Sequence, residues 1–95
     1  MQIEREDNGS KGRYTARATE DGPEAELTYS RAGTERIILD HTGVPDEYRG
    51  MGVGLALVAR AVEDARAEGL RILPLCPFAA AQFRRHPEWA DVLDR

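Results

Sequence analysis

The pattern of hydrophobic and polar residues in the first half of the chain indicates β-strands separated by turn-forming residues. Residues 25–31 alternate apolar and polar side chains, as in a strand with one face in water. Residues 13–19 are β-compatible and lie between turn-forming residues. Residues 36–44 contain Ile-Ile-Leu in succession, which is typical of a strand covered on both faces. We therefore predict three strands here, of which the third is central.

The period changes to that of a helix after Pro45, which ends the third strand. Residues 55–68 place apolar side chains on one helical stripe, and Gly69 is a suitable C-terminal cap. A short apolar run at residues 70–75 follows, so strand, helix and strand succeed one another as in a βαβ unit with parallel strands. The stripe that we expect in the core consists of Leu55, Val58, Ala59, Val62 and Ala65.

A second helix is predicted to begin at Pro77, because proline is favoured at the first helical position, and to end before Pro87. We expect Phe78, Phe83 and Trp89 from this region to pack in the core. Together the elements predict an α/β (α+β) sandwich. It has a mostly antiparallel, splayed sheet of four or five strands, one βαβ crossover and a short C-terminal helical segment.

The composition fits one small globular domain over residues 1–95, with 41% hydrophobic and 32% charged residues. The net charge of -4 argues against a nucleic-acid partner. Cys76 is the only cysteine, which excludes an intrachain disulfide and suits a reducing compartment. The longest weakly polar run is too short to span a bilayer. We expect a cytoplasmic protein, monomeric or weakly dimeric, without a membrane partner or a metal site.

Residues 49–54 have the sequence Arg-Gly-Met-Gly-Val-Gly and connect the third strand to the first helix. A turn of this kind leaves several backbone N–H groups unpaired at the start of the helix, where the helix dipole is positive. The glycines lack the Cβ atoms that would keep a phosphate away, and Arg49 adds a cation with a planar donor fork. The loop predicts a site for a diphosphate; the alternative is a glycine-rich loop that is only a tight turn.

Two other phosphate-binding classes fit the spacing poorly. A Walker loop has Lys followed by Ser or Thr after its last glycine, whereas Leu55 and Ala56 stand there. A dinucleotide-binding fold has its first glycine directly at the strand end, whereas five residues separate Val44 from Gly50. Nucleotide triphosphatases and dinucleotide-binding enzymes are therefore disfavoured.

The loop resembles the Arg/Gln-x-x-Gly-x-Gly/Ala signature of the Gcn5-related N-acetyltransferases, and it lies between the expected strand and helix. In that superfamily the loop amides hold the pyrophosphate of acetyl-coenzyme A (acetyl-CoA), and the preceding strand runs beside its pantetheine arm. The resemblance therefore implies acetyl-CoA or coenzyme A as the cofactor. The residues that it implies for cofactor binding are Val44, Arg49, Gly50, Met51, Gly52, Val53 and Gly54.

A narrower resemblance covers nearly the whole chain. It rests on HTGVP at 41–45, the loop, PLCPF at 74–78, Phe83 and HPE at 86–88, which are similar to small, single-domain acetyltransferase-like proteins related to bacterial YidJ. Such proteins lack much of the N-terminal helical region that builds an acceptor pocket in larger relatives. No helix-like stretch precedes the loop here either, so the resemblance implies cofactor binding and leaves the acceptor open.

Acetyl transfer requires a base for the amine, a stabilised oxyanion and a leaving thiolate. His41 is the candidate base, because imidazole titrates near neutral pH and the residue lies on the strand expected to flank the cofactor, where regular alternation places it on the face of Leu39 and Gly43. The alternative is a strand histidine that only bonds a nearby loop. Cys76, at the expected N-cap of the second helix, is a candidate to relay the acyl group or to protonate departing coenzyme A. The alternative for Cys76 is a small core side chain.

Arg84 and Arg85 form a compact cationic cluster with His86 at the end of the second predicted helix. They are candidates for contact with the 3′-phosphate and adenine of the cofactor. Basic residues in a last helical turn also complement the helix dipole without any ligand.

The leading functional prediction is acetyl transfer from acetyl-CoA to a primary amine of a small molecule or a peptide by direct attack. The first alternative is a non-catalytic module or sensor that binds coenzyme A or an acyl form of it. The second is a protein-interaction domain that binds no cofactor.

Overall fold

A computed structural model describes residues 1–94 of the chain. Its elements are β1 Gln2–Asp7, β2 Lys11–Arg17, β3 Ala25–Ala32, β4 Arg36–Gly43, a 3-10 turn at Asp46–Tyr48, α1 Val53–Glu68, β5 Arg71–Pro74, α2 Pro77–Arg85 and a second 3-10 turn at Pro87–Val92. The five strands form one sheet in chain order. Strands β1 to β4 are antiparallel, and β5 is parallel to β4. The predicted mixed fold with its βαβ crossover is confirmed.

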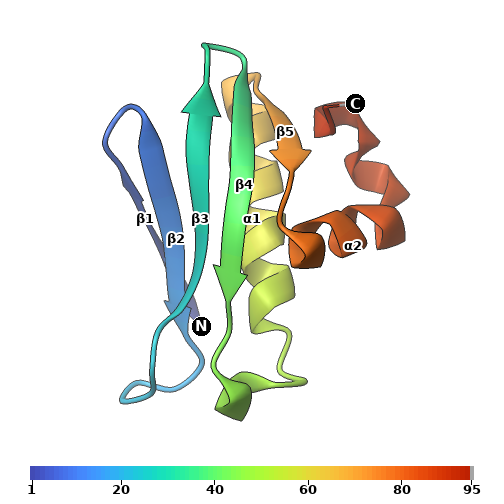
Figure 1. Cartoon of the computed structure of the whole chain (residues 1–95). Coiled ribbons are helices and arrows are strands. Elements are labelled where there is room, and N and C mark those ends of the chain that lie inside the picture. Colours follow the sequence, from blue (N-terminus) through green and yellow to red (C-terminus); the bar gives the residue numbers. More distant parts are fainter. Residues whose placement is uncertain (95) are drawn as a thin grey trace.

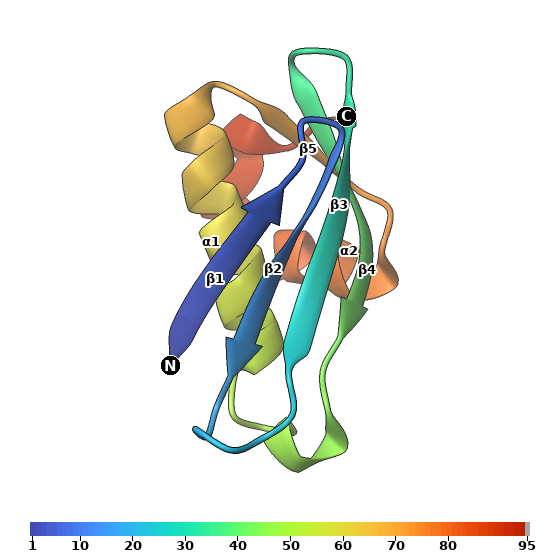
Figure 2. The same cartoon turned by 90° about the vertical axis from the view of Figure 1, so that its left-hand side faces the viewer.

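Both helices lie on the same face of the sheet (Figure 1). Helix α1 packs against β2, β3 and β5, and α2 lies beside the edge formed by β4 and β5. In the view turned by 90°, no helix of residues 1–94 covers the opposite face, which is called the open face below (Figure 2). None of the helices described is long and apolar enough to cross a membrane.

The first strand, β1, was not predicted from the sequence. Its residues carry one large apolar side chain, Ile3, among charged and polar ones, which is a weak strand signal. The strand forms at the edge of the sheet, and Arg5 points inward from it over the rings of Tyr14 and Tyr29, 5.4 Å from each ring centroid. Arg5 also pairs with Glu68 of α1 at 2.6 Å. Charged edge strands of this kind resist pairing with other chains.

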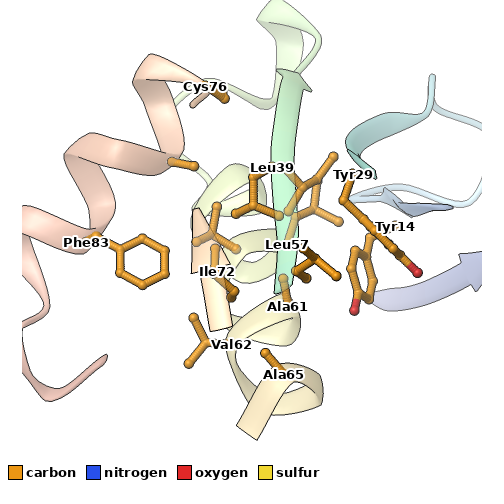
Figure 3. Close-up of a cluster of buried hydrophobic side chains, with 14 of the residues drawn as sticks. Tyr14, Tyr29, Leu39, Leu57, Ala61, Val62, Ala65, Ile72, Cys76 and Phe83 are labelled. Carbon is orange, nitrogen blue, oxygen red and sulfur yellow. The ribbon is translucent and has the colours of Figure 1, made fainter. Parts of the chain in front are cut away.

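The apolar core lies between α1 and the sheet (Figure 3). Phe83 and Trp89 belong to it as predicted. The helical stripe was predicted slightly out of phase: Leu55 is exposed and Ala59 half-buried. Phe78 is also 37% exposed, because it lies in a groove described below. The face of α1 that is buried consists of Val53, Gly54, Leu57, Val58, Ala61, Val62 and Ala65.

Polar groups close the core under the β1–β2 hairpin. Tyr14 donates a hydrogen bond to Asp64 at 2.8 Å. Burial, and to a smaller extent this bond, raise the pKa of the Tyr14 hydroxyl. Tyr29 donates to Asp7, and Arg31 binds the same carboxylate at 2.6 Å. The hydrogen bond from Arg31, followed by that from Tyr29, holds the pKa of Asp7 well below its ordinary value. These bonds fix the hairpin to the rest of the fold.

Candidate functional site

The loop between β4 and α1 has the backbone conformation that its glycines predict. Gly50 and Gly52 have φ values of 79° and 76°, in the left-handed region that favours glycine. Gly52 is the N-cap of α1 and has no side chain to bond the first amides of the helix. The local sequence therefore leaves the helix start uncapped by any side chain.

The loop amides divide into two groups. The amides of Arg49 and Met51 donate to Asp46 and Tyr48 at 3.0 Å each, which closes the 3-10 turn. The remaining amides find no acceptor within residues 1–94 and belong to Gly50, Gly52, Val53, Gly54 and Leu55. Unpaired donors at a helix N-terminus are an anion-binding feature.

These amides open into a groove of about 340 Å³. The mouth of α1 is therefore not filled by packed side chains, and the first turn of α1 contains no acidic residue. The groove is lined by Val44, Pro45, Asp46, Tyr48, Arg49, Gly50, Gly52, Val53, Gly54, Leu55, Phe78 and Gln82.

Arg49 provides the cation at the rim of the groove. Its guanidinium bonds Asp46 at 3.0 Å, but both side chains are more than 80% exposed. Exposed ion pairs of this kind contribute little free energy. Arg49 can therefore exchange Asp46 for an anionic ligand at small cost.

The other end of the groove is apolar. A Cβ atom on Gly54 would lie 2.6 Å from Cζ of Phe78 and 3.3 Å from Cγ2 of Val44, so the glycine allows these side chains to pack against the helix start. Two of the large hydrophobic side chains that are exposed in residues 1–94, Leu55 and Phe78, line the groove. The groove thus combines anion-binding amides with an apolar wall, which suits a ligand with a phosphate end and a less polar arm.

The strands β4 and β5 separate beside this wall. Their pairing runs from Arg36 and Arg71 to Leu39 and Pro74. The amide of Cys76 then donates to the carbonyl of Leu39 at 3.1 Å, after which α2 turns away from β4. The splay predicted between these strands is therefore present, and the second half of β4 lacks a strand partner on this side within residues 1–94.

A β-bulge in β4 corrects the predicted direction of His41. Tyr29 lies opposite Leu39, but the next residue of β3, Thr28, lies opposite His41, so Asp40 is an extra residue in β4. The extra residue shifts the alternation by one position. His41 consequently lies on the open face with Thr28 and is exposed, rather than on the face of Leu39 as regular alternation predicted.

Thr42 takes the inward position that was expected for His41. It lies opposite the buried Leu27, and its Oγ1 atom is 3.2 Å from Sγ of Cys76. Cys76 is the N-cap of α2, as predicted, and only 5% exposed. No sequence pattern pointed to Thr42, since regular alternation places it on the opposite face.

The surroundings of the Cys76 sulfur favour its anionic form. Burial alone would raise the pKa of the thiol. The Thr42 hydroxyl and the nearby amides of Ala79, Phe78 and Thr42 outweigh burial, so the pKa of Cys76 lies below its ordinary value.

The cationic pair in α2 does not act as one unit. Arg84 lines a separate pocket with Phe83 and His86, away from the loop groove. Arg85 is exposed on the same helical stripe as Phe78 and Gln82, which line the loop groove. Only Arg85 therefore lies on the side of the helix that a ligand in the groove would approach.

His86, predicted with this cluster, has a structural role. Its ring stacks on Trp89 with centroids 4.2 Å apart, and Nδ1 is 2.7 Å from the carbonyl oxygen of Gln82. No group of three or more His, Cys, Asp or Glu side chains in residues 1–94 is arranged to hold a metal ion.

Comparison with known proteins adds to this geometry. Residues 13–92 match the model of a family described as GCN5-related N-acetyl-transferase. Among solved structures, the solution structure of a GCN5-like candidate N-acetyltransferase from Staphylococcus aureus is similar, with 33% identity and a TM-score of 0.76. The match covers 98% of this chain and 87% of that chain. No protein of curated function matches at a significant level.

Proposed function

Because the chain belongs to the GCN5-related N-acetyltransferase family, we propose that it binds acetyl-CoA and transfers the acetyl group to a primary amine by direct attack. The observation that carries this proposal is the set of unpaired amides at the start of α1, those of Gly50, Gly52, Val53, Gly54 and Leu55, which opens into the groove. A pyrophosphate fits there because each amide supplies a donor and the helix dipole favours negative charge.

The residues of the groove suit the remaining parts of acetyl-CoA. Arg49 supplies a mobile cation for the phosphates, and Arg85 is the better placed of the two α2 arginines for the 3′-phosphate. Val44 and Phe78 provide an apolar wall along the route from the loop to the splay. When bound, acetyl-CoA supplies the activated thioester, and these residues orient it and exclude water.

The bulge supports direct attack, because it separates a base and an acid across one strand. His41 lies on the open face, where an amine from solvent can arrive, and it is the group that we propose takes the proton of the amine. Cys76 lies on the helix side, where its thiol can donate a proton to the departing thiolate of coenzyme A. In direct attack the base must reach the amine and the acid must reach the departing sulfur, which are two different substituents of the reacting carbon.

Gly43 lies next to His41 and Glu26 at the end of β4. A Cβ atom there would lie 3.2 Å from Nε2 of His41 and 3.8 Å from Cγ of Glu26. The lack of a side chain leaves backbone accessible between an imidazole and a carboxylate. A positively charged primary amine suits this position, which supports a small amine or a lysine side chain as the acceptor.

The first test is binding, followed by turnover. Thermal melting with and without acetyl-CoA should show stabilisation, by about 2.7 kcal/mol when the ligand is at one hundred times its dissociation constant. Thiol release should then be measured with a panel of amines and lysine peptides, against the background of hydrolysis. Absence of stabilisation would contradict cofactor binding, and stabilisation without release above background would contradict catalysis.

The open face also favours a second candidate, a non-catalytic module that binds coenzyme A or acyl-CoA. No element of residues 1–94 covers this face to form an acceptor pocket. The variants His41→Ala and Cys76→Ala separate the two functions. An enzyme that uses either residue loses turnover with little change in cofactor affinity, whereas a binding module keeps its function in both variants.

A further inference from the structure

We propose that Thr42 is a positioning residue for Cys76: its hydroxyl donates a hydrogen bond to the sulfur and stabilises the thiolate that remains when Cys76 gives up its proton. This inference rests on the proposed function for its role in the reaction. Its structural basis is the contact of 3.2 Å between Oγ1 of Thr42 and Sγ of Cys76.

The backbone explains why Thr42 reaches the sulfur. The extra residue Asp40 turns Thr42 toward the helix side of the sheet, opposite Leu27. Cys76 is held at that place from the other strand, because its amide bonds the carbonyl of Leu39 at 3.1 Å where β4 and β5 separate. Both partners are therefore fixed by backbone hydrogen bonds rather than by mobile loops.

Polar N–H and O–H groups of two elements lie near the sulfur, among them the amide of Thr42 itself. Thr42 approaches from β4, and the amides of Phe78 and Ala79 approach from the first turn of α2. The charged or titratable side chains on the neighbouring elements lie away from the sulfur. In β4, Asp40 bonds Ser30 and His41 is on the open face. Arg71 is exposed at the start of β5, Arg60 of α1 lies over Tyr14, and Arg84 and Arg85 are at the far end of α2. Hydrogen bonds rather than an ion pair thus set the protonation of the thiol.

The proton balance of the step is closed. As the carbon–sulfur bond of the tetrahedral intermediate breaks, the electron pair goes to the sulfur of coenzyme A, and the Cys76 proton moves to that sulfur. The Cys76 thiolate then takes a proton from solvent, while His41 releases to solvent the proton that it took from the amine. A donor to the thiolate makes Cys76 a stronger acid near neutral pH, which favours proton donation.

The test uses the fact that Cys76 is the only cysteine. Absorbance near 240 nm reports thiolate, so a pH titration of the whole chain, with Cys76→Ala as the blank, gives the pKa of this one thiol. Thr42→Val keeps the shape but removes the hydroxyl and should raise this pKa by about one to two pH units, the shift for losing a hydrogen bond to a charged group. Thr42→Ser retains the hydroxyl and should restore most of the wild-type value.

A kinetic measurement tests the role in the reaction. The alkaline limb of the pH profile of kcat, where Cys76 loses its proton, should move upward in Thr42→Val by the same amount as the titrated pKa, with KM for acetyl-CoA unchanged. A thiol pKa that is the same in wild type and Thr42→Val would overturn the proposal, as would an equal shift in Thr42→Ser. The titration needs no activity, so a wild-type protein without turnover refutes the proposed function and leaves the Thr42–Cys76 bond separately testable.

Discussion

Substitution of Gly54 by alanine is expected to impair cofactor binding far more than folding. Gly54 is the second residue of α1. Its amide is unpaired, and a side chain at this position would point toward the ring of Phe78. The new Cβ atom would be 2.6 Å from Cζ of Phe78, whereas carbon atoms in contact are about 3.5 Å apart. The ring must therefore move by roughly 1 Å, and the groove is the open space available to it.

The expected free energies differ for the two properties. Overpacking costs about 1–3 kcal/mol, and the lower end applies because the ring of Phe78 is 37% exposed and can move. Alanine recovers up to about 1 kcal/mol through its helix propensity. The net loss of stability is then about 0–1 kcal/mol, or at most roughly 8 °C in Tm for a chain of this size. Alanine keeps the amide, but the Phe78 ring displaced into the groove blocks the phosphate from it; loss of one hydrogen bond to a charged phosphate costs about 1.5–3 kcal/mol, a ten- to hundredfold weaker Kd.

Calorimetric titration with acetyl-CoA and thermal melting measure the two quantities on the same samples. The matched control places Gly54→Ala in a Phe78→Ala background, where the steric conflict is absent and alanine should no longer destabilise the fold. Unchanged affinity in folded Gly54→Ala would refute the assignment of the groove to acetyl-CoA. A stability loss that persists without the Phe78 ring would refute the steric explanation.

Three further predictions concern the backbone of the loop and the polar groups under the hairpin. Gly52→Ala should lower the free energy of unfolding in urea by about 1–2 kcal/mol, because φ is 76° and no atom lies close enough to the new Cβ to add a steric conflict. Gly52→Asn should lower it less, since asparagine tolerates the left-handed region, and equal losses would contradict this cause. Asp7, whose pKa Arg31 lowers, contributes stability above its unfolded pKa near 4 that is lost as pH falls, so Asp7→Asn should flatten the acid side of the stability curve. Burial and the bond to Asp64 raise the pKa of Tyr14, so the stability that the Tyr14 hydroxyl contributes is lost as the pH rises above about 10. Tyr14→Phe should lower the free energy of unfolding by about 1 kcal/mol at neutral pH and reduce that alkaline loss.

The part of the fold that sequence patterns predicted correctly is the part where apolar periodicity is strong. Strand β3 carries a clear period of two, β4 an apolar run and helix α1 a period of 3.6, and their positions are confirmed to within a few residues. The cap positions at Gly69 and Cys76 are also confirmed, because their backbone requirements are local. Local chemistry likewise predicted the unpaired amides of the loop, which are present.

The features that sequence patterns missed depend on contacts between distant segments. Strand β1 is held in place by contacts of Arg5 with the rings of Tyr14 and Tyr29 and with Glu68. These partners lie outside β1 in the sequence, so the local pattern of β1 does not predict them. The bulge at Asp40 is set by the register of β3 against β4, which the alternation within β4 alone does not encode. Because the extra residue in β4 was not predicted, His41 and Thr42 were each assigned to the wrong face of the sheet.

The bulge places His41 and Thr42 on the faces that the proposed reaction requires. With regular alternation from Leu39, the imidazole of His41 would face the helices and the hydroxyl of Thr42 would face solvent. An amine arriving from solvent needs its base on the open face, and a departing thiol needs its proton donor beside the cofactor arm. The extra residue Asp40 meets both needs on one strand. Substitutions of His41 should therefore act on the acceptor side of the reaction, and substitutions of Thr42 on the release of coenzyme A.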